Sequence, residues 1–151
     1  MMASFEEELE RSGRLIYRNA GVSMRPLIKQ DRDILIITKP EGRLKKYDIP
    51  LYKRGGNQYV LHRIVKVRDN DYVILGDNCL RKEYGITDDQ IIGVLTSLVR
   101  KGKEVNFNGF GYRFYTRFWY AVYPVRVIFM EARIVAGKIK RKLTGKCKTA
   151  Q

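Results

Sequence analysis

Short apolar runs separated by turn residues fill the first two-thirds of the chain. Runs of this length, bounded by Gly, Pro, Asn and Asp, predict β-strands, and the segments 55–57 and 69–71 between them predict hairpin turns. The predicted strands are residues 14–18, 33–38, 47–52, 59–67, 72–75 and 90–95. We therefore expect a mainly β fold of small antiparallel strands.

The longest of these runs, residues 59–67, alternates like a single continuous strand. One face would carry Leu61, Arg63, Val65 and Val67, and the other would carry Val60, His62, Ile64 and Lys66. His62 would then share its face with apolar neighbours and be partly buried. The next strand ends at Gly76-Asp77, so antiparallel pairing would bring Asp77 into the neighbourhood of His62.

The two ends of the chain carry helical patterns instead. Ser4-Phe5-Glu6-Glu7 is a capping-box pattern and predicts a short helix that ends near Gly13. Beyond Pro124, apolar residues recur at helical spacing with Lys and Arg between them, which predicts a basic amphipathic helix. Such a helix would either cover the β domain or lie on an anionic lipid surface.

No segment is predicted to cross a membrane. The longest uncharged run near the C-terminus, residues 118–125, has eight residues and contains a proline, whereas a spanning helix needs about 20 apolar residues. The acidic start of the chain does not have the pattern of a secretory signal. Cys79 and Cys147 match no metal-binding spacing and offer no disulfide framework, and the lack of such a framework favours a reducing compartment. We expect a cytoplasmic protein, peripheral to the membrane if the basic helix binds lipid.

The positive charge is concentrated at the C-terminal end. Residues 1–99 hold 17 Lys and Arg against 14 Asp and Glu, whereas residues 100–151 hold 13 against two. We therefore expect a domain at 1–108, with its β core at about 14–100, and a basic aromatic region at 109–151. The basic region suggests an anionic partner, either membrane lipid or nucleic acid. A recognisable DNA-binding helix-turn-helix is missing, so the sequence does not favour nucleic acid.

One serine loop and one histidine suggest catalytic chemistry. Ser23 follows Gly21 and precedes Pro26, in a loop that could present its hydroxyl. His62 is the single histidine of the sequence, and its ordinary pKa of about 6.5 suits a general base. Asp77 could hold the imidazole in one tautomer and complete a serine triad. Taken singly, each is an ordinary turn or packing residue, and Cys79 is expected to be structural.

The order of these motifs resembles signal peptidase I in its serine–histidine branch. The similar segments are Ser23-Met24-x-Pro26, His62-Arg63-Ile64-Val65 and Gly76-Asp77-Asn78, with the segments 32–37 and 90–95. The resemblance covers about residues 14–100. The resemblance implies a coiled antiparallel sheet of the signal-peptidase and LexA type. It also implies a serine endopeptidase that cleaves a precursor protein or peptide through an acyl-enzyme, with Ser23 as nucleophile and His62 as base. It implies no metal or cofactor.

The chain departs from that family at two places in the site. Gly21 stands where the family often has a hydroxyl, so backbone N–H groups would hold the oxyanion. Arg81-Lys82-Glu83 replaces an acidic pair, and Asp88 and Asp89 come later. Asp77 is the predicted orienting carboxylate, with these later acidic residues and Glu83 as alternatives. The alternative function is a non-catalytic basic module that binds anionic membrane or nucleic acid through its C-terminal region.

Overall fold

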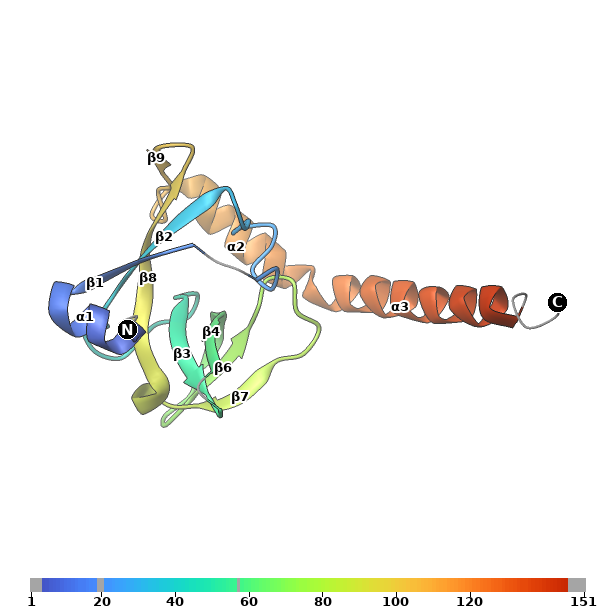
Figure 1. Cartoon of the computed structure of the whole chain (residues 1–151), viewed down its shortest axis with the longest axis horizontal. Helices are drawn as coiled ribbons and strands as arrows, with labels where there is room; N and C mark the ends of the chain where they lie inside the picture. Colours follow the sequence, from blue (N-terminus) through green and yellow to red (C-terminus); the bar gives the residue numbers. More distant parts are fainter. Residues whose placement is uncertain (1–3, 19–20, 57, 147–151) are drawn as a thin grey trace. The chain divides into compact units, whose positions relative to one another are not determined.

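The computed structural model describes residues 4–18, 21–56 and 58–146 (Figure 1). The chain divides into two compact units, Met1–Tyr112 and Arg113–Gln151. The predicted boundary lay four residues earlier. Each unit is described by itself below.

The first unit begins with the predicted short helix, α1 (Phe5–Ser12). The Ser4 hydroxyl accepts a hydrogen bond from the Glu7 backbone, and the Glu7 carboxylate accepts one from the Ser4 backbone, which confirms the capping box. Glu6 accepts hydrogen bonds from Tyr59 and from Lys53 on the sheet. The Tyr59 hydroxyl contributes most to lowering the pKa of Glu6 to about 2. These contacts hold α1 on the β core.

Six strands form the larger antiparallel sheet, in the order β1-β2-β8-β3-β4 with β9 paired to β8. β8 is the longest strand and pairs with both β2 and β3. The strands are β1 (Arg14–Tyr17), β2 (Asp33–Thr38), β3 (Pro50–Arg54), β4 (Gln58–Leu61), β8 (Ile91–Arg100) and β9 (Lys103–Glu104).

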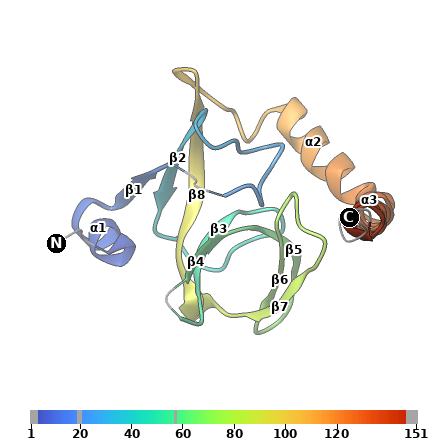
Figure 2. The same cartoon turned by 45° about the vertical axis from the view of Figure 1, so that its right-hand side comes forward.

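A second antiparallel sheet has three strands, β5 (Arg63–Val67), β6 (Tyr72–Leu75) and β7 (Glu83–Ile86). Figure 2 shows β3 to β7 curling into a half-barrel beside β8. A single 3₁₀ turn, η1 (Asp88–Gln90), then leads into β8. The buried cluster inside the half-barrel draws from both sheets and comprises Leu44, Tyr52, Ile64, Tyr72, Ile74, Ile86 and Ile91. The prediction of a β-rich fold with a short N-terminal helix and a C-terminal helical region is confirmed.

The prediction of one continuous strand over 59–67 is wrong. β4 ends at Leu61 in the larger sheet, and β5 begins at Arg63 in the smaller one. His62 therefore lies at the junction between two sheets. The predicted alternation of faces fails there, because four consecutive residues, 61–64, are all buried. A chain that passes from one sheet to another is covered on both sides at the crossing.

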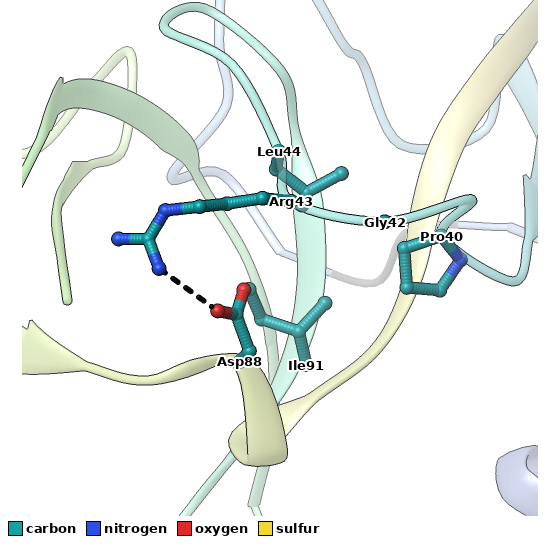
Figure 3. A pocket seen from close by; sticks show the side chains of 6 residues that line it. All are labelled: Pro40, Gly42, Arg43, Leu44, Asp88 and Ile91. Atoms are coloured by element: carbon teal, nitrogen blue, oxygen red, sulfur yellow. Dashed lines mark hydrogen bonds and ion pairs between the residues drawn. The ribbon is translucent and has the colours of Figure 1, made fainter. Parts of the chain in front are cut away.

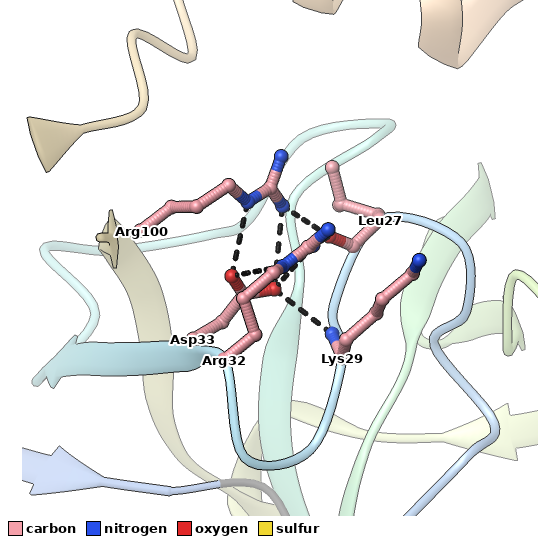
Figure 4. A network of polar contacts seen from close by, with 5 residues as sticks. All are labelled: Leu27, Lys29, Arg32, Asp33 and Arg100. Carbon is pink, nitrogen blue, oxygen red and sulfur yellow. Dashed lines mark hydrogen bonds and ion pairs between the residues drawn. The ribbon is translucent and has the colours of Figure 1, made fainter.

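A charged cluster fixes the end of the loop that carries Ser23 (Figure 4). The fully buried carboxylate of Asp33, at the start of β2, accepts hydrogen bonds from Arg32, Arg100 and the Lys29 backbone. Burial acts to raise the pKa of Asp33, but the two guanidinium groups and the backbone N–H hold it well below its usual range. Arg32 and Arg100 also donate to the Leu27 carbonyl, which ties the returning loop to the sheet.

Two helices make up the C-terminal part, α2 (Phe110–Ala121) and α3 (Tyr123–Lys146). Pro124 lies in the first turn of α3, where a missing backbone N–H costs no helical hydrogen bond. Along the described residues, no helix combines the length and the hydropathy that crossing a membrane requires.

Candidate active site

His62 is held at the sheet junction by strand pairing on both sides. Leu61 pairs with Leu51 in the larger sheet, and Arg63 pairs with Leu75 in the smaller one. His62, between them, cannot change its position without breaking one of these two strand registers. The His62 residue is 6% exposed, so its ring meets mostly protein rather than water.

The Nδ1 side of the ring faces a carboxylate. Glu83 Oε1, at the start of β7, lies 3.0 Å from His62 Nδ1. The Tyr52 hydroxyl lies 3.3 Å from the same nitrogen. Arg54 donates a hydrogen bond to the same oxygen of Glu83. Donation from Nδ1–H to Glu83 fixes the imidazole tautomer and leaves Nε2 as an acceptor.

Asp77 does not take the position that the sequence predicted for it. Its two carboxylate oxygens accept hydrogen bonds of 3.0 Å each from Arg63 Nε and Nη2, and both side chains are 0% exposed. Arg63 also donates to the Tyr47 carbonyl and to the Tyr112 hydroxyl. The carboxylate hydrogen-bonded to Nδ1 of His62 is Glu83, not Asp77.

Burial gives the physical reason for this difference. A buried guanidinium stays charged and needs a carboxylate beside it, whereas a buried imidazole can stay neutral. Of the alternatives, the Asp88 carboxylate binds Tyr72 and Arg43. Glu83 begins a four-residue strand, β7, that hydrophobic periodicity did not predict. The missing signal was tertiary, because β6 had to be paired with β7 before Glu83 could be placed.

The other side of the His62 ring faces a glycine where three segments meet. A Cβ atom at Gly76 would lie 2.6 Å from Cys79 Sγ, 2.8 Å from the Ser23 carbonyl oxygen and 3.0 Å from His62 Cδ2. The first two distances are too short for a real Cβ and the third is tight, so the close approach requires glycine at this position. The Ser23 backbone carbonyl and the His62 ring, 39 positions apart in the sequence, therefore both lie against the same side of Gly76.

Backbone contacts hold the Ser23 loop against the segment after β6. The Asn78 backbone N–H donates to the Ser23 carbonyl at 2.7 Å, and its side-chain amide donates to the Val22 carbonyl at 3.3 Å. Met24 is fully buried, whereas Ser23 is partly exposed. The predicted convergence of the Ser23 loop, His62 and the Gly76-Asp77-Asn78 segment is present, although Asp77 faces Arg63 within it.

Cys79 also belongs to this group. Its Sγ lies 3.8 Å from His62 Nε2. Burial raises the pKa of the Cys79 thiol, and burial also lowers the pKa of His62, although Glu83 acts in the opposite direction on the histidine. At neutral pH the site therefore holds a neutral imidazole beside a protonated thiol. A neutral imidazole with an available Nε2 can accept a proton.

Metal-ligand clusters and cavities are the other features of the described residues that bear on ligand binding. Among them, no cluster of three His, Cys, Asp or Glu side chains could hold a metal ion. A cavity of about 320 Å³ lies elsewhere in the first unit and shares no lining residue with the His62 site (Figure 3). An ion pair of 3.2 Å joins Arg43 to Asp88 at its wall, and the rest of the lining is Pro40, Gly42, Leu44 and Ile91.

The first unit is thus a β-rich domain in which a buried histidine pairs with a partly exposed carboxylate beside a serine loop. No protein-family model, no curated protein and no solved structure matches the chain. What the site does is therefore inferred from its own geometry and from the order of its motifs.

Proposed function

We propose that the protein is a serine endopeptidase, similar to signal peptidase I, that cleaves a peptide or precursor protein through an acyl-enzyme. The observation that carries the proposal is the hydrogen bond from His62 Nδ1 to Glu83, with the opposite side of the ring next to Gly76 and the Ser23 backbone. A base oriented by a carboxylate beside a candidate nucleophile is the arrangement that acyl transfer by serine requires.

In the proposed reaction, the Ser23 hydroxyl attacks the substrate carbonyl while its proton moves to His62 Nε2. The C–O bond forms, the carbonyl π electrons move onto oxygen, and backbone N–H groups near Ser23 hold the oxyanion. The imidazolium then gives its proton to the leaving amine as the C–N bond breaks. Water attacks the acyl-enzyme with His62 again as base, which releases the acid and restores Ser23.

In this reaction Glu83 orients His62 and stabilises its protonated form. It accepts a hydrogen bond from Nδ1–H in the resting state, and its negative charge stabilises the imidazolium that forms in each proton transfer. Arg54, which donates to Glu83, holds that carboxylate in place. We assign Glu83 a positioning role, since it acts through His62 rather than on the substrate.

One distance favours a second candidate nucleophile. Cys79 Sγ, 3.8 Å from Nε2, could be activated by the same base and give a thioester intermediate. The raised pKa of the thiol counts against this, because reactive cysteines normally have a lowered pKa. We therefore assign the attack to Ser23 and treat Cys79 as part of the wall of the site.

Cleavage of a defined peptide library, read by mass spectrometry, tests the proposal. Ser23→Ala and His62→Ala should each abolish cleavage, and the double variant should be scarcely worse, because nucleophile and base act as one unit. The matched control Ser12→Ala changes an exposed serine on α1 and should cleave normally. If Ser23→Ala cleaved at the wild-type rate while Cys79→Ala did not, the thiol would be the nucleophile. Failure of the wild type to cleave or acylate would favour the non-catalytic basic module instead.

A further inference from the structure

The helices α2 and α3 expose an unusual amount of apolar surface. Of the twelve large hydrophobic side chains that are exposed among the described residues, nine belong to these two helices. Scattered single apolar side chains are normal on a protein surface, whereas a contiguous set marks an interaction site. Their concentration on two helices makes these helices a candidate interaction surface.

On α3 five of the six large apolar side chains that are exposed follow one face, whereas Ile134 lies on the opposite face. Val125, Ile128, Phe129, Val135 and Ile139 fall within a single stripe at about 100° per residue, and each is more than half exposed. The helix has 24 residues and so is roughly 36 Å long. An apolar stripe of this length lies open to solvent in the described chain.

Cationic side chains far outnumber acidic ones along the two helices. Between 113 and 142 the sequence has eight Lys and Arg and a single acidic residue, Glu131. Arg133, Lys138, Lys140, Arg141 and Lys142 are all exposed. An apolar face bordered by cations complements a surface that is apolar inside and anionic outside.

Aromatic pairs add a third property. Phe114 stacks on Phe118 and Tyr115 on Trp119, each at helical i,i+4 spacing, and the Arg126 guanidinium lies 3.7 Å from the Trp119 ring centre. Aromatic rings with polar edges, together with Arg and Lys, are typical of segments at the membrane–water interface.

From these three properties we infer that α2 and α3 bind the surface of an anionic lipid membrane. The helices would lie in the interface with the apolar stripe of α3 against the acyl boundary and the cations at the headgroups. The inference is independent of the proposed peptidase reaction. A nucleic acid would use the cations but leave the apolar stripe in water, and a second copy of the chain would bring two strongly cationic helices together.

Vesicle binding by the full chain tests the inference, with Trp119, the single tryptophan, as the reporter. Vesicles of phosphatidylserine and phosphatidylcholine should shift its fluorescence to shorter wavelength and sediment with the protein. Vesicles of phosphatidylcholine alone should bind far more weakly, and rising salt should weaken binding to the anionic vesicles.

Two variants separate the charge from the apolar face, each with a matched control. The triple change Lys138→Gln, Lys140→Gln and Arg141→Gln should weaken binding about 100-fold at low salt, since each charge contributes about a fivefold effect. Lys45→Gln, Lys46→Gln and Lys101→Gln are its control on the first unit. Ile128→Asn should weaken binding about tenfold or more, whereas Ile16→Asn, at 62% exposure against 67%, should not.

Four results would overturn the inference. The first is that the full chain does not bind anionic vesicles at low salt, or binds neutral ones equally well. The second is that the variants bind like their controls. The third is that the chain binds duplex DNA as tightly as vesicles, with Ile128→Asn changing neither affinity. A dimer that Ile128→Asn dissociates, detected by sedimentation, would also overturn the inference.

Discussion

The buried Arg63–Asp77 pair allows a sharp test of which carboxylate serves His62. In Asp77→Asn the side chain keeps its size but loses its charge, which leaves the fully buried Arg63 guanidinium without its two charge-assisted hydrogen bonds. Removing one partner of a buried ion pair typically costs about 3–5 kcal/mol. For a chain of this length that corresponds to a fall in Tm of about 6–20 °C. We expect Asp77→Asn to be strongly destabilised.

Glu83→Gln should behave in the opposite way. Its side chain is partly exposed, and its partner Arg54 is more exposed still, so the stability cost should be about 1 kcal/mol or less. Turnover should fall by up to about four orders of magnitude, because the glutamine does not hold the imidazole in the same tautomer or stabilise its charge. The exposed Asp89→Asn is the control and should change neither property.

The assay pairs thermal unfolding, followed by circular dichroism, with peptide cleavage measured well below each variant's Tm. The double variant Arg63→Met, Asp77→Leu replaces the ion pair by apolar groups and should regain stability relative to Asp77→Asn while still cleaving. The assignment of Glu83 as the carboxylate that orients His62 would be wrong if Asp77→Asn kept the wild-type Tm but lost turnover while Glu83→Gln stayed fully active. That pattern would return the orienting role to Asp77.

Three further predictions concern His62, Gly76 and Asp33. Because burial holds the pKa of His62 below about 6.5, the acidic limb of kcat/KM should lie below that pH. Glu83→Gln should move it lower still, since Glu83 raises that pKa; a shift to higher pH would contradict this. Gly76→Ala should abolish cleavage because its Cβ meets the Ser23 carbonyl, whereas Gly55→Ala, with open space around it, should cleave normally. Asp33→Asn should lower the free energy of unfolding by more than about 1 kcal/mol above pH 4, with Asp31→Asn as control; since the folded pKa of Asp33 is lowered, that difference should vanish as pH falls through it.

Local signals were sufficient to predict most of the strands and both helical ends. The capping box at Ser4 and the apolar runs of β2, β6 and β8 depend on residues that are close in the sequence. The sequence alone is therefore enough to predict these elements. The break at His62 depends instead on which sheet each half of the run joins. That choice is made by pairing with β3 and β6, and no local pattern records it.

The same distinction separates the site residues. The predicted convergence of Ser23 and His62 rested on motif order, and the structure brings both to Gly76. The choice between Asp77 and Glu83 rested on strand adjacency alone. The prediction of Asp77 failed because Arg63, next to His62, is buried with a permanent charge and pairs with the Asp77 carboxylate.

In the proposed reaction His62, oriented by Glu83, activates Ser23. The most direct measurement is to treat the full chain with a fluorophosphonate probe, which forms a stable ester with an activated serine, and to map the modified residue by mass spectrometry. We expect an adduct on Ser23 that disappears in His62→Ala and is strongly reduced in Glu83→Gln. Activation of Ser23 by His62 would be contradicted by no adduct on Ser23, or by an adduct whose rate of formation does not change in His62→Ala.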